Sequence, residues 1–263
     1  MYLTYTEEQS ALRDELRAYF ATLMTPERVE SLSKGELDGP AYKEIVRQLG
    51  ADGWLGLAWP KEYGGGGRDL LDQYIFFDES QRAQVPVPFL TLNTVGPTIM
   101  HLGSEEQKAF FLPKILAGDL HFSIGYSEPG AGTDLASLTT TAVRDGDHYV
   151  INGQKMWTSL IHHADYIWLA CRTDPDAKRH KGLSMIIVPT DVDGFSYTKV
   201  HTPGRGYTRA PYYDNVRVPL QNAVFQQNRG SDPPTLHPHP QPGPLPSPRA
   251  PAPHPPPTPS GAR

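Results

Sequence analysis

The sequence predicts an α+β fold in which an N-terminal α-helical domain is followed by an antiparallel β-barrel or sandwich domain. Three observations predict this order. Apolar residues recur at helical spacing up to about residue 119, short β-rich runs with turn signals follow to residue 230, and prolines dominate the rest. We therefore expect a helical domain at 1–119, a β-domain at 120–230 and a disordered proline-rich tail at 231–263.

The same start signal opens the first and the last helix of the helical domain. Thr6 to Gln9 has the form S/T-x-x-E/Q of a capping box, in which each of the two side chains bonds the other residue's backbone N–H. Ser104 to Gln107 repeats that form before the last helix, in which Pro113 is a candidate kink. The predicted helices run from Thr6 to Leu23, from Pro40 to Leu49, and over 70–84, 92–102 and 104–116, with a loop at 54–67.

After Gly118 the spacing of the apolar residues changes from helical to strand-like. Turn pairs such as Asp145-Gly146 and Asn152-Gly153 separate the runs, as they do in hairpins. Eight short runs at this spacing favour an antiparallel barrel or sandwich. The predicted strands are 122–126, 138–144, 148–151, 155–160, 166–172, 183–189, 195–200 and 212–218.

The composition excludes several classes of protein. A single cysteine, Cys171, rules out a disulfide framework and a thiolate metal site, and it suits a reducing cytosol. The N-terminus has no apolar signal region and no stretch reaches the ~18 apolar residues of a membrane span, so we expect a cytoplasmic protein without membrane contact. The net charge is −5 and there is no Lys/Arg cluster, so nucleic acid is not an expected partner.

A histidine pair in the β-domain is the one pattern that suggests a metal. His162 and His163 are adjacent, with Asp165 close by in the sequence. Adjacent side chains on a strand or turn point apart, and no third ligand stands at a useful spacing. We therefore predict no metal site.

The proline-rich tail differs in kind from the rest of the chain. Fourteen of the 27 prolines lie in 231–263, which holds no Lys, Glu or aromatic residue. Such a segment cannot bury enough apolar surface to offset its ordering entropy, so disorder without function is the default expectation. A polyproline II ligand at 251–259 is the alternative, although no basic anchor stands at the usual spacing. The abrupt change of amino-acid composition after Gly230 also suggests a frameshifted or truncated gene product.

The segment from Phe122 to Leu135 is the most informative part of the chain. A strand there runs into a glycine-rich loop, in which Gly130 and Gly132 allow a close approach of the backbone to a ligand. Thr133 and successive N–H groups can hold phosphate oxygens. The loop lacks the spacing of a dinucleotide fingerprint or a phosphate loop, so the residues alone favour a tight turn between strands over an anion-binding loop.

Two motifs together carry a resemblance to a known family. Tyr126 to Asp134, followed about twenty residues later by Ile151 to Ser159, resembles the paired signatures of the acyl-CoA dehydrogenase family. Trp59 to Gly65, Val216 to Pro219 and Asn228 to Gly230 resemble further parts of the same pattern. The resemblance covers residues 5–230, and it is strongest to actinobacterial dehydrogenases that act on steroid side-chain thioesters.

The resemblance implies an FAD site on the β-domain. The backbone from Ile124 to Thr133 is expected to line the flavin ring and the pyrophosphate, the Ser127 hydroxyl to bond the pyrimidine side, and Thr133 to meet a phosphate oxygen. Trp157 is expected to pack against the ring system and Ser159 to approach the nitrogen that receives hydride, although an isolated Trp is more often a core residue. The implied cofactor-binding residues are Ile124, Tyr126, Ser127, Gly132, Thr133, Trp157 and Ser159.

The resemblance also implies a reaction, in fatty-acid or steroid side-chain β-oxidation. An acyl-CoA substrate loses an α-proton to a carboxylate base and a β-hydride to the flavin, which gives a trans-2-enoyl-CoA, and an electron-transferring flavoprotein takes the electrons. Glu128 belongs to the flavin loop, so we do not expect it to be that base. The family's base lies in a C-terminal helical bundle, and the tail at 231–263 stands in its place. We therefore expect no catalytic residue in this chain.

The tail limits what the chain is expected to do alone. Without the helical bundle, we expect weak or absent FAD retention and no turnover. Two rival interpretations follow, a dehydrogenase that is incomplete in this chain and a non-catalytic chain. The second is either a decaying gene product or a subunit of a homo- or hetero-oligomer whose partner, another acyl-CoA dehydrogenase chain, supplies the base.

Overall fold

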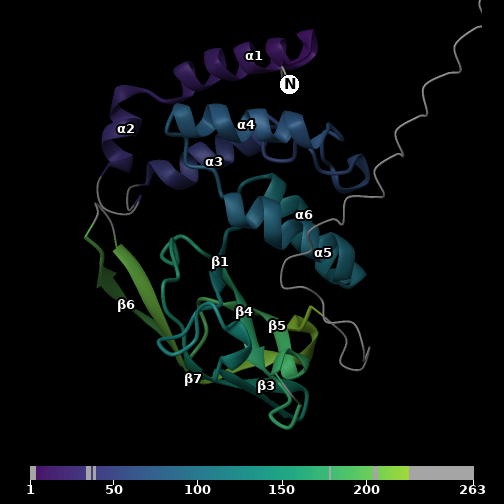
Figure 1. Ribbon diagram of the computed structural model, residues 1–263, viewed down its shortest axis with the longest axis vertical. Helices are drawn as coiled ribbons and strands as arrows, with labels where there is room; N and C mark the ends of the chain where they lie inside the picture. The colour runs from purple at the N-terminus through teal and green to yellow at the C-terminus, as the bar shows by residue number, and fades with distance from the viewer. Residues whose placement is uncertain (1–3, 34–36, 38–39, 178, 204–206, 225–263) are drawn as a thin grey trace, which may run out of the picture.

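Helices occupy the first part of the chain and strands the second, in the predicted order (Figure 1). The computed structural model describes residues 4–33, 37, 40–177, 179–203 and 207–224. The predicted tail at 231–263 and the Asn228 to Gly230 motif lie outside the described residues. The helices form a layer that covers one side of the sheet (Figure 1).

Both predicted capping boxes are present. Thr6 accepts from the backbone N–H of Gln9 at 3.2 Å, and its own N–H donates to the Gln9 side chain at 3.0 Å. Ser104 and Gln107 exchange the same pair of bonds. The α-helices are α1 (Glu7–Leu23), α2 (Pro26–Leu32), α3 (Ala41–Ala51), α4 (Leu70–Arg82), α5 (Gly96–Leu102) and α6 (Glu105–Leu116), with a short 3-10 turn at Lys61–Tyr63 and a π-helical turn at Thr91–Val95.

Two details of the helical domain differ from the prediction. Pro26 does end the first helix, but it also opens α2, since proline fits the first helical position, and the Thr25 side chain caps that helix. The predicted 92–102 helix is a π-helical turn that continues into α5. The carbonyl of Leu92 in that turn accepts a hydrogen bond from the Trp59 indole N–H at 3.1 Å, which ties the loop at 54–67 to this helix.

The β-domain is one sheet of seven strands in the order β1-β4-β2-β3-β7-β6, with β5 paired to β4. Its strands are β1 (Phe122–Gly125), β2 (Thr141–Asp145), β3 (His148–Gln154), β4 (Tyr166–Arg172), β5 (Leu183–Pro189), β6 (Phe195–His201) and β7 (Tyr207–Pro219). The prediction of a purely antiparallel sheet is wrong, because β1 and β2 both pair with β4 in parallel. The chain between β1 and β4 contains a complete hairpin, so it returns to β4 running in the original direction.

The predicted strand at 155–160 does not form. Lys155 and Thr158 donate backbone hydrogen bonds to Pro211 and Arg209 of β7, each at 2.9 Å, but the ladder stops there. Trp157 and Leu160 have φ angles of 64° and 57°, which place both in the left-handed region and turn the chain away from the sheet.

Strand β4 joins the two domains because its alternate residues enter different cores. Trp168 and Ala170 lie in a cluster that extends into the helical layer, among residues such as Phe20 and Ile45. Ile167, Leu169 and Cys171 point to the other face, into a cluster formed within the β-domain. Burial raises the pKa of the Cys171 thiol to about 12, so this cysteine is an unreactive core residue.

None of the helices in the described part of the chain has the length and apolar character that crossing a membrane requires.

The packing of the π-helical turn predicts the effect of Gly96→Ala. A Cβ at this position would lie 2.2 Å from Cζ2 of the buried Trp59 ring, so the ring or the helix must move. We expect the free energy of unfolding in urea to fall by about 1–3 kcal/mol. Gly130→Ala is the control, since its Cβ would meet nothing within 4 Å and the change should stay within about 0.5 kcal/mol. Equal losses in the two variants would contradict this packing.

Candidate functional site

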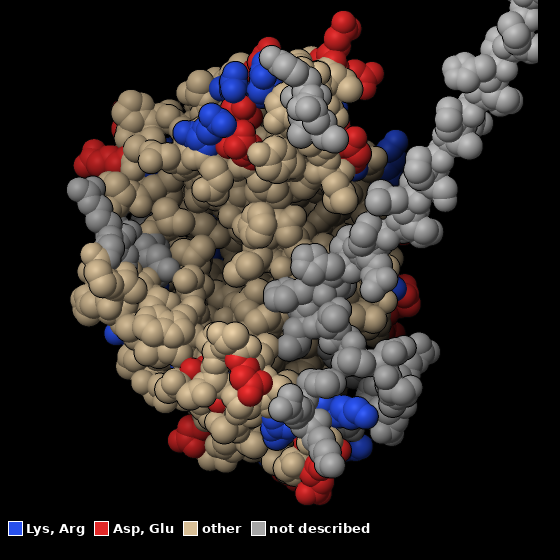
Figure 2. Space-filling model, viewed as in Figure 1, with Lys and Arg blue, Asp and Glu red and all other residues tan. Residues whose placement is uncertain are grey.

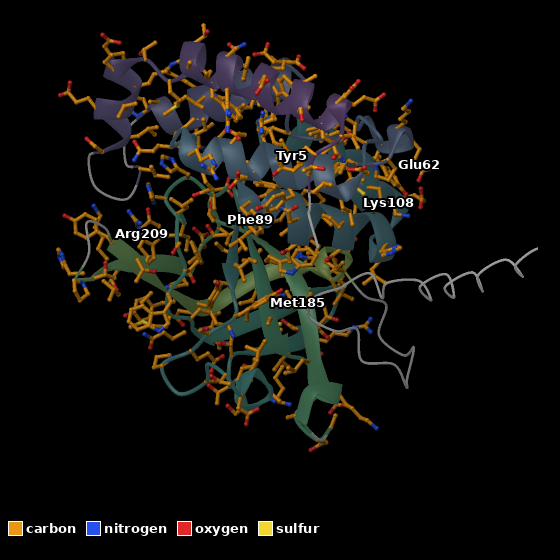
Figure 3. The ribbon with its side chains drawn as sticks, turned by 45° about the horizontal axis from the view of Figure 1, so that its top comes forward. Tyr5, Glu62, Phe89, Lys108, Met185 and Arg209 are labelled. Carbon is orange, nitrogen blue, oxygen red and sulfur yellow. The ribbon has the colours of Figure 1, made fainter. Side chains whose placement is uncertain are left out.

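A hollow with a mostly uncharged visible lining lies between the helical layer and the sheet (Figure 2). Phe89 lies between the two layers (Figure 3), with its side chain 52% exposed and its ring 4.9 Å from that of Phe77. Leu90 is also exposed. Apolar side chains left open beside a hollow are typical of a surface that binds a ligand or another chain.

The two sequence motifs meet next to β1. The backbone N–H of Met156 donates to the carbonyl of Ser127 at 2.8 Å, and the Ser123 hydroxyl donates to the carbonyl of Ser159 at 2.8 Å. These bonds place the segment that follows β3 beside the segment that follows β1. Residues about thirty positions apart in the sequence therefore form one surface.

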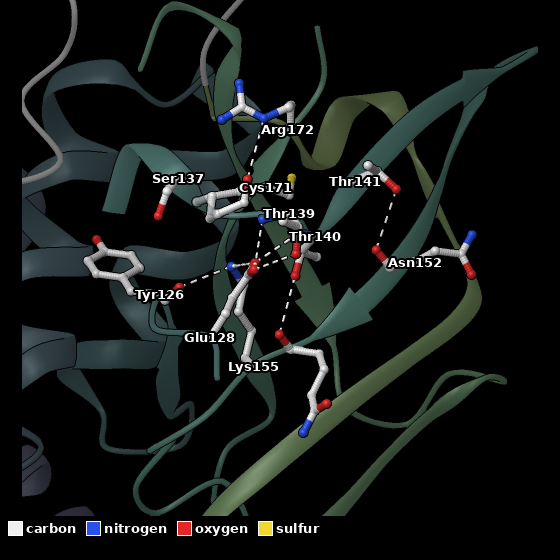
Figure 4. A network of polar contacts seen from close by, with 12 residues as sticks. Tyr126, Glu128, Ser137, Thr139, Thr140, Thr141, Asn152, Lys155, Cys171 and Arg172 are labelled. Carbon is white, nitrogen blue, oxygen red and sulfur yellow. Dashed lines mark hydrogen bonds and ion pairs between the residues drawn. The ribbon is translucent and has the colours of Figure 1, made fainter. Parts of the chain in front are cut away.

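A buried ion pair fastens the two motifs together (Figure 4). The Lys155 ammonium lies 2.8 Å from Oε1 of Glu128 and donates to the carbonyl of Tyr126 at 3.0 Å. Thr139 donates to Oε2 of Glu128 with both its backbone N–H and its hydroxyl, each at 2.7 Å, and the Thr140 N–H donates to Oε1 at 2.9 Å. We call Glu128, Lys155, Thr139 and Thr140 the clamp.

The surroundings of Glu128 keep it ionised. Its side chain is 4% exposed and that of Lys155 is fully buried. Burial alone would raise the pKa of Glu128, but the Lys155 ammonium and the hydrogen bonds from Thr140 and Thr139 outweigh it and lower the pKa to about 2. Because four donors already occupy its oxygens, this carboxylate cannot take a proton from a substrate at neutral pH.

Trp157 occupies an unusual position beside the clamp. Its φ of 64° is strained for a bulky residue, and its side chain is 57% exposed. Ser159 is also exposed, whereas Thr158 between them is buried. Strain and exposure of a large aromatic side chain together indicate a surface shaped for a ligand rather than for the protein core.

The glycine-rich loop forms a tight turn that is open on its outer side. Glu128 and Ala131 exchange backbone hydrogen bonds at 2.7 and 3.2 Å, which close the turn. A Cβ on Gly130 or Gly132 would meet nothing within 4 Å, so protein packing does not demand glycine at either position. Gly132 and Thr133 are exposed. The tight turn predicted from the sequence is thus present, and its exposed side leaves room for a ligand against the backbone.

The structure brings together five of the seven residues implied as cofactor contacts. Ile124, Tyr126 and Ser127 are half-buried at the end of β1, next to the exposed Trp157 and Ser159. Burial raises the pKa of the Tyr126 phenol to about 12, so it stays neutral. Gly132 and Thr133 lie farther along the loop, and within the described residues they share no hydrogen bond with 155–159.

The sequence prediction missed the role of Lys155. It stands inside the second motif, yet only the first motif's Glu128 received attention as a chemical group. The signal was available, since a lysine in a run that is otherwise predicted as buried strand needs an acidic partner. Ser123, which positions the Ser159 carbonyl, gave no such signal because a serine in a strand is common.

The described residues contain no group of three or more histidine, cysteine or acidic side chains arranged to hold a metal ion.

Comparison with known proteins identifies the family. The sequence matches the profile of the acyl-CoA dehydrogenase N-terminal domain at residues 6–119 and that of the acyl-CoA dehydrogenase middle domain at residues 123–216. The chain belongs to the acyl-CoA dehydrogenase family. The family predicted from the two motifs is therefore confirmed, and its members are oxidoreductases that use FAD.

Two curated relatives and two solved structures support the narrower resemblance. The chain is 63% identical over 236 residues to acyl-CoA dehydrogenase FadE26 and 53% identical over 231 residues to acyl-CoA dehydrogenase FadE29, both of Mycobacterium tuberculosis. In each case the match covers 88% of this chain and 59% of the relative.

Among the solved structures, the chain resembles the ChsE4-ChsE5 complex of M. tuberculosis with a TM-score of 0.82, 63% identity, and coverage of 88% of this chain and 59% of that chain. It resembles the structure described as Tcur3481-Tcur3483 steroid ACAD with a TM-score of 0.82, 57% identity, and coverage of 86% and 59%. The chain thus spans about three fifths of the length of the relatives that it matches.

The clamp predicts a specific loss of stability in acid. The folded-state pKa of Glu128 is about 2 against an ordinary 4.5, so its contribution is fully present above pH 4.5 and disappears as the pH falls toward 2. The contribution is about 3 kcal/mol, because each pKa unit corresponds to about 1.4 kcal/mol. Urea unfolding of the wild type and Glu128→Gln should show a stability difference that shrinks across this window. A difference independent of pH would contradict the clamp.

Proposed function

We propose that this chain provides the flavin-binding surface of an FAD-dependent acyl-CoA dehydrogenase, which converts an acyl-CoA thioester to a trans-2-enoyl-CoA. The observation that carries the proposal is that the ion pair of the clamp, between Glu128 of the first motif and Lys155 of the second, holds the two motifs side by side. It sets the strained, exposed Trp157 beside the end of β1. A flat aromatic cofactor needs an exposed ring to pack against and polar atoms at its edge, and this surface offers both.

The residues present suit FAD in their chemistry. We assign Trp157 to the ring system, with Ile124, Tyr126 and Ser127 on the same surface, and Ser159 to the edge of the ring. The open turn at Gly132 and Thr133 would hold the pyrophosphate through its exposed backbone N–H groups and the Thr133 hydroxyl. Bound FAD supplies the acceptor for the hydride that leaves the substrate's β-carbon. The hydroxyls and N–H dipoles of these residues would stabilise the negative charge that arrives on the bound group.

We place the proton acceptor outside the described residues. Dehydrogenation needs a carboxylate on the side of the substrate away from the flavin, and Glu128 is held by the clamp on the protein's side of the loop. The base is then supplied by another part of a complete enzyme or by a second subunit. An electron-transferring flavoprotein is the proposed electron acceptor.

A heteromeric enzyme is the form we favour. Two of the structures that this chain resembles are described as pairs of proteins, ChsE4 with ChsE5 and Tcur3481 with Tcur3483, the latter as a steroid enzyme. By analogy with those pairs, we propose that a second acyl-CoA dehydrogenase subunit assembles with this chain. We propose a steroid side-chain thioester as the substrate class and a cytoplasmic location, which a single buried cysteine suits.

Visible absorption spectra of the purified full chain test this function. We expect the chain to bind FAD. Under anaerobic conditions, we expect acyl-CoA to bleach the flavin absorption only when a second subunit has been co-expressed. Bleaching by the chain alone would contradict the external base. Failure to bind FAD both alone and with the partner would overturn the flavin-binding surface itself.

Trp157→Gly separates cofactor binding from folding. We expect the dissociation constant for FAD to rise about tenfold, which corresponds to about 1.4 kcal/mol of lost ring packing. The cofactor-free chain should be as stable as the wild type or more stable by up to about 1 kcal/mol, because glycine adopts a φ of 64° without strain.

Tyr197→Ala is the control for this variant, since Tyr197 is an exposed aromatic residue on β6 and should leave the FAD affinity unchanged. An unaltered FAD affinity in Trp157→Gly would remove Trp157 from the site.

A further inference from the structure

The start of α3 packs against the turn that follows the flavin-facing segment. The Tyr42 ring stacks on that of His163 at 4.4 Å with an interplanar angle of 11°, and it lies 5.5 Å from the ring of His121. The His162 and His163 rings are 4.1 Å apart. We call these four residues the junction cluster. Tyr42 belongs to the helical domain and the three histidines to the β-domain. His162 and His163 lie three and four positions after Ser159, and His121 directly precedes β1.

Short hydrogen bonds make the turn between Ser159 and β4 rigid. His163 and Ala164 donate backbone bonds to Leu160 and Ile161 at 2.9 and 3.2 Å. Asp165 donates its N–H to the His121 carbonyl at 2.9 Å and accepts from the His121 N–H at 2.8 Å. The turn therefore moves as one unit with the start of β1.

Ring packing and a polar contact of His163, whose Nε2 lies 2.6 Å from the Leu37 carbonyl, hold the junction cluster together. His121 is 3% exposed, and burial lowers its pKa to about 4, so it is neutral at neutral pH. The charged groups around it are Asp165 and, from α3, Lys43 and Arg47; Lys43 lies 3.7 Å from Asp165 and Arg47 2.9 Å from Asp119. Both ion pairs are partly exposed and contribute little.

The segment beside the junction cluster needs support. Trp157 and Leu160 both have left-handed backbone angles, which are unfavourable for residues other than glycine. Such a conformation persists only where the surroundings fix it. The Ser123 bond to Ser159 fixes one point, and the stack of Tyr42 on His163 fixes the other end of the turn.

We propose that Tyr42 is a positioning residue through which the helical domain fixes the geometry of residues 157–159. Its effect passes through His163 and the turn at 160–165 to Trp157 and Ser159. The consequence for FAD rests on the proposed function, whereas the support of the strained segment does not.

The test compares three variants of the full chain. Tyr42→Leu removes the stacked ring, Tyr42→Phe keeps it, and Phe20→Leu removes a buried ring of the helical domain that contacts Tyr19 and Phe76 instead. Amide hydrogen exchange is measured over 157–163 and over β3, and FAD affinity is measured in parallel. Exchange reports local opening without any cofactor.

We expect Tyr42→Leu to speed exchange over 157–163 about tenfold relative to β3 and to weaken FAD binding about tenfold, the equivalent of about 1.4 kcal/mol each. Tyr42→Phe should restore both values. Phe20→Leu should lower the global stability without a selective change at 157–163. Unchanged exchange in Tyr42→Leu, or the same pattern in Phe20→Leu, would overturn the proposal.

Two arrangements keep the test decisive. If Tyr42→Leu does not fold, His163→Asn removes the other ring of the stack together with the contact of His163 Nε2 with the Leu37 carbonyl, and it should speed exchange over 157–163 at least as much. If the wild type binds no FAD either alone or with a second subunit, the proposed function fails, but selective exchange at 157–163 would still support the positioning role of Tyr42.

Discussion

The buried ion pair between Lys155 and Glu128 is the interaction on which the candidate site depends. It connects a loop after β1 to a segment after β3, and it also secures 139–140 through the carboxylate. A buried charge without its partner is strongly unfavourable. Moving either segment away would leave the other segment's charge buried and unpaired. The two motifs are consequently one structural unit, and this unit fixes the positions of the exposed residues Trp157 and Ser159.

A sheet with two buried faces makes this arrangement possible. Because β4 sends alternate residues into two cores, it is fixed from both sides, and β1 pairs with it in parallel register from Phe122 to Gly125. The strained turn at 157–160 then extends from a rigid base toward the helical layer. The rigid elements hold the site, and the short unpaired segments between them present the side chains that a cofactor would meet.

Local sequence signals predicted the parts of this structure that local forces decide. The two capping boxes, the burial of Cys171 and the family motifs were all predictable from neighbouring residues. Strand direction was not, since the parallel pairing of β1 with β4 depends on where a distant hairpin places the chain. The segment at 155–160 looks like a strand by composition, and only the left-handed angle of Trp157 ends it. The clamp was not predicted either, because its two charged residues are 27 positions apart and only the fold brings them together.

A double-mutant cycle on Glu128 and Lys155 tests the central claim most directly. The single variants Glu128→Gln and Lys155→Met and their combination are compared with the wild type for the free energy of unfolding and for FAD affinity. We expect each single variant to lose about 3–5 kcal/mol of stability and the double variant to lose much less than their sum, with the same non-additivity in FAD binding. Additive losses in both quantities would show that the two residues act independently, and the account of one clamped surface would be wrong.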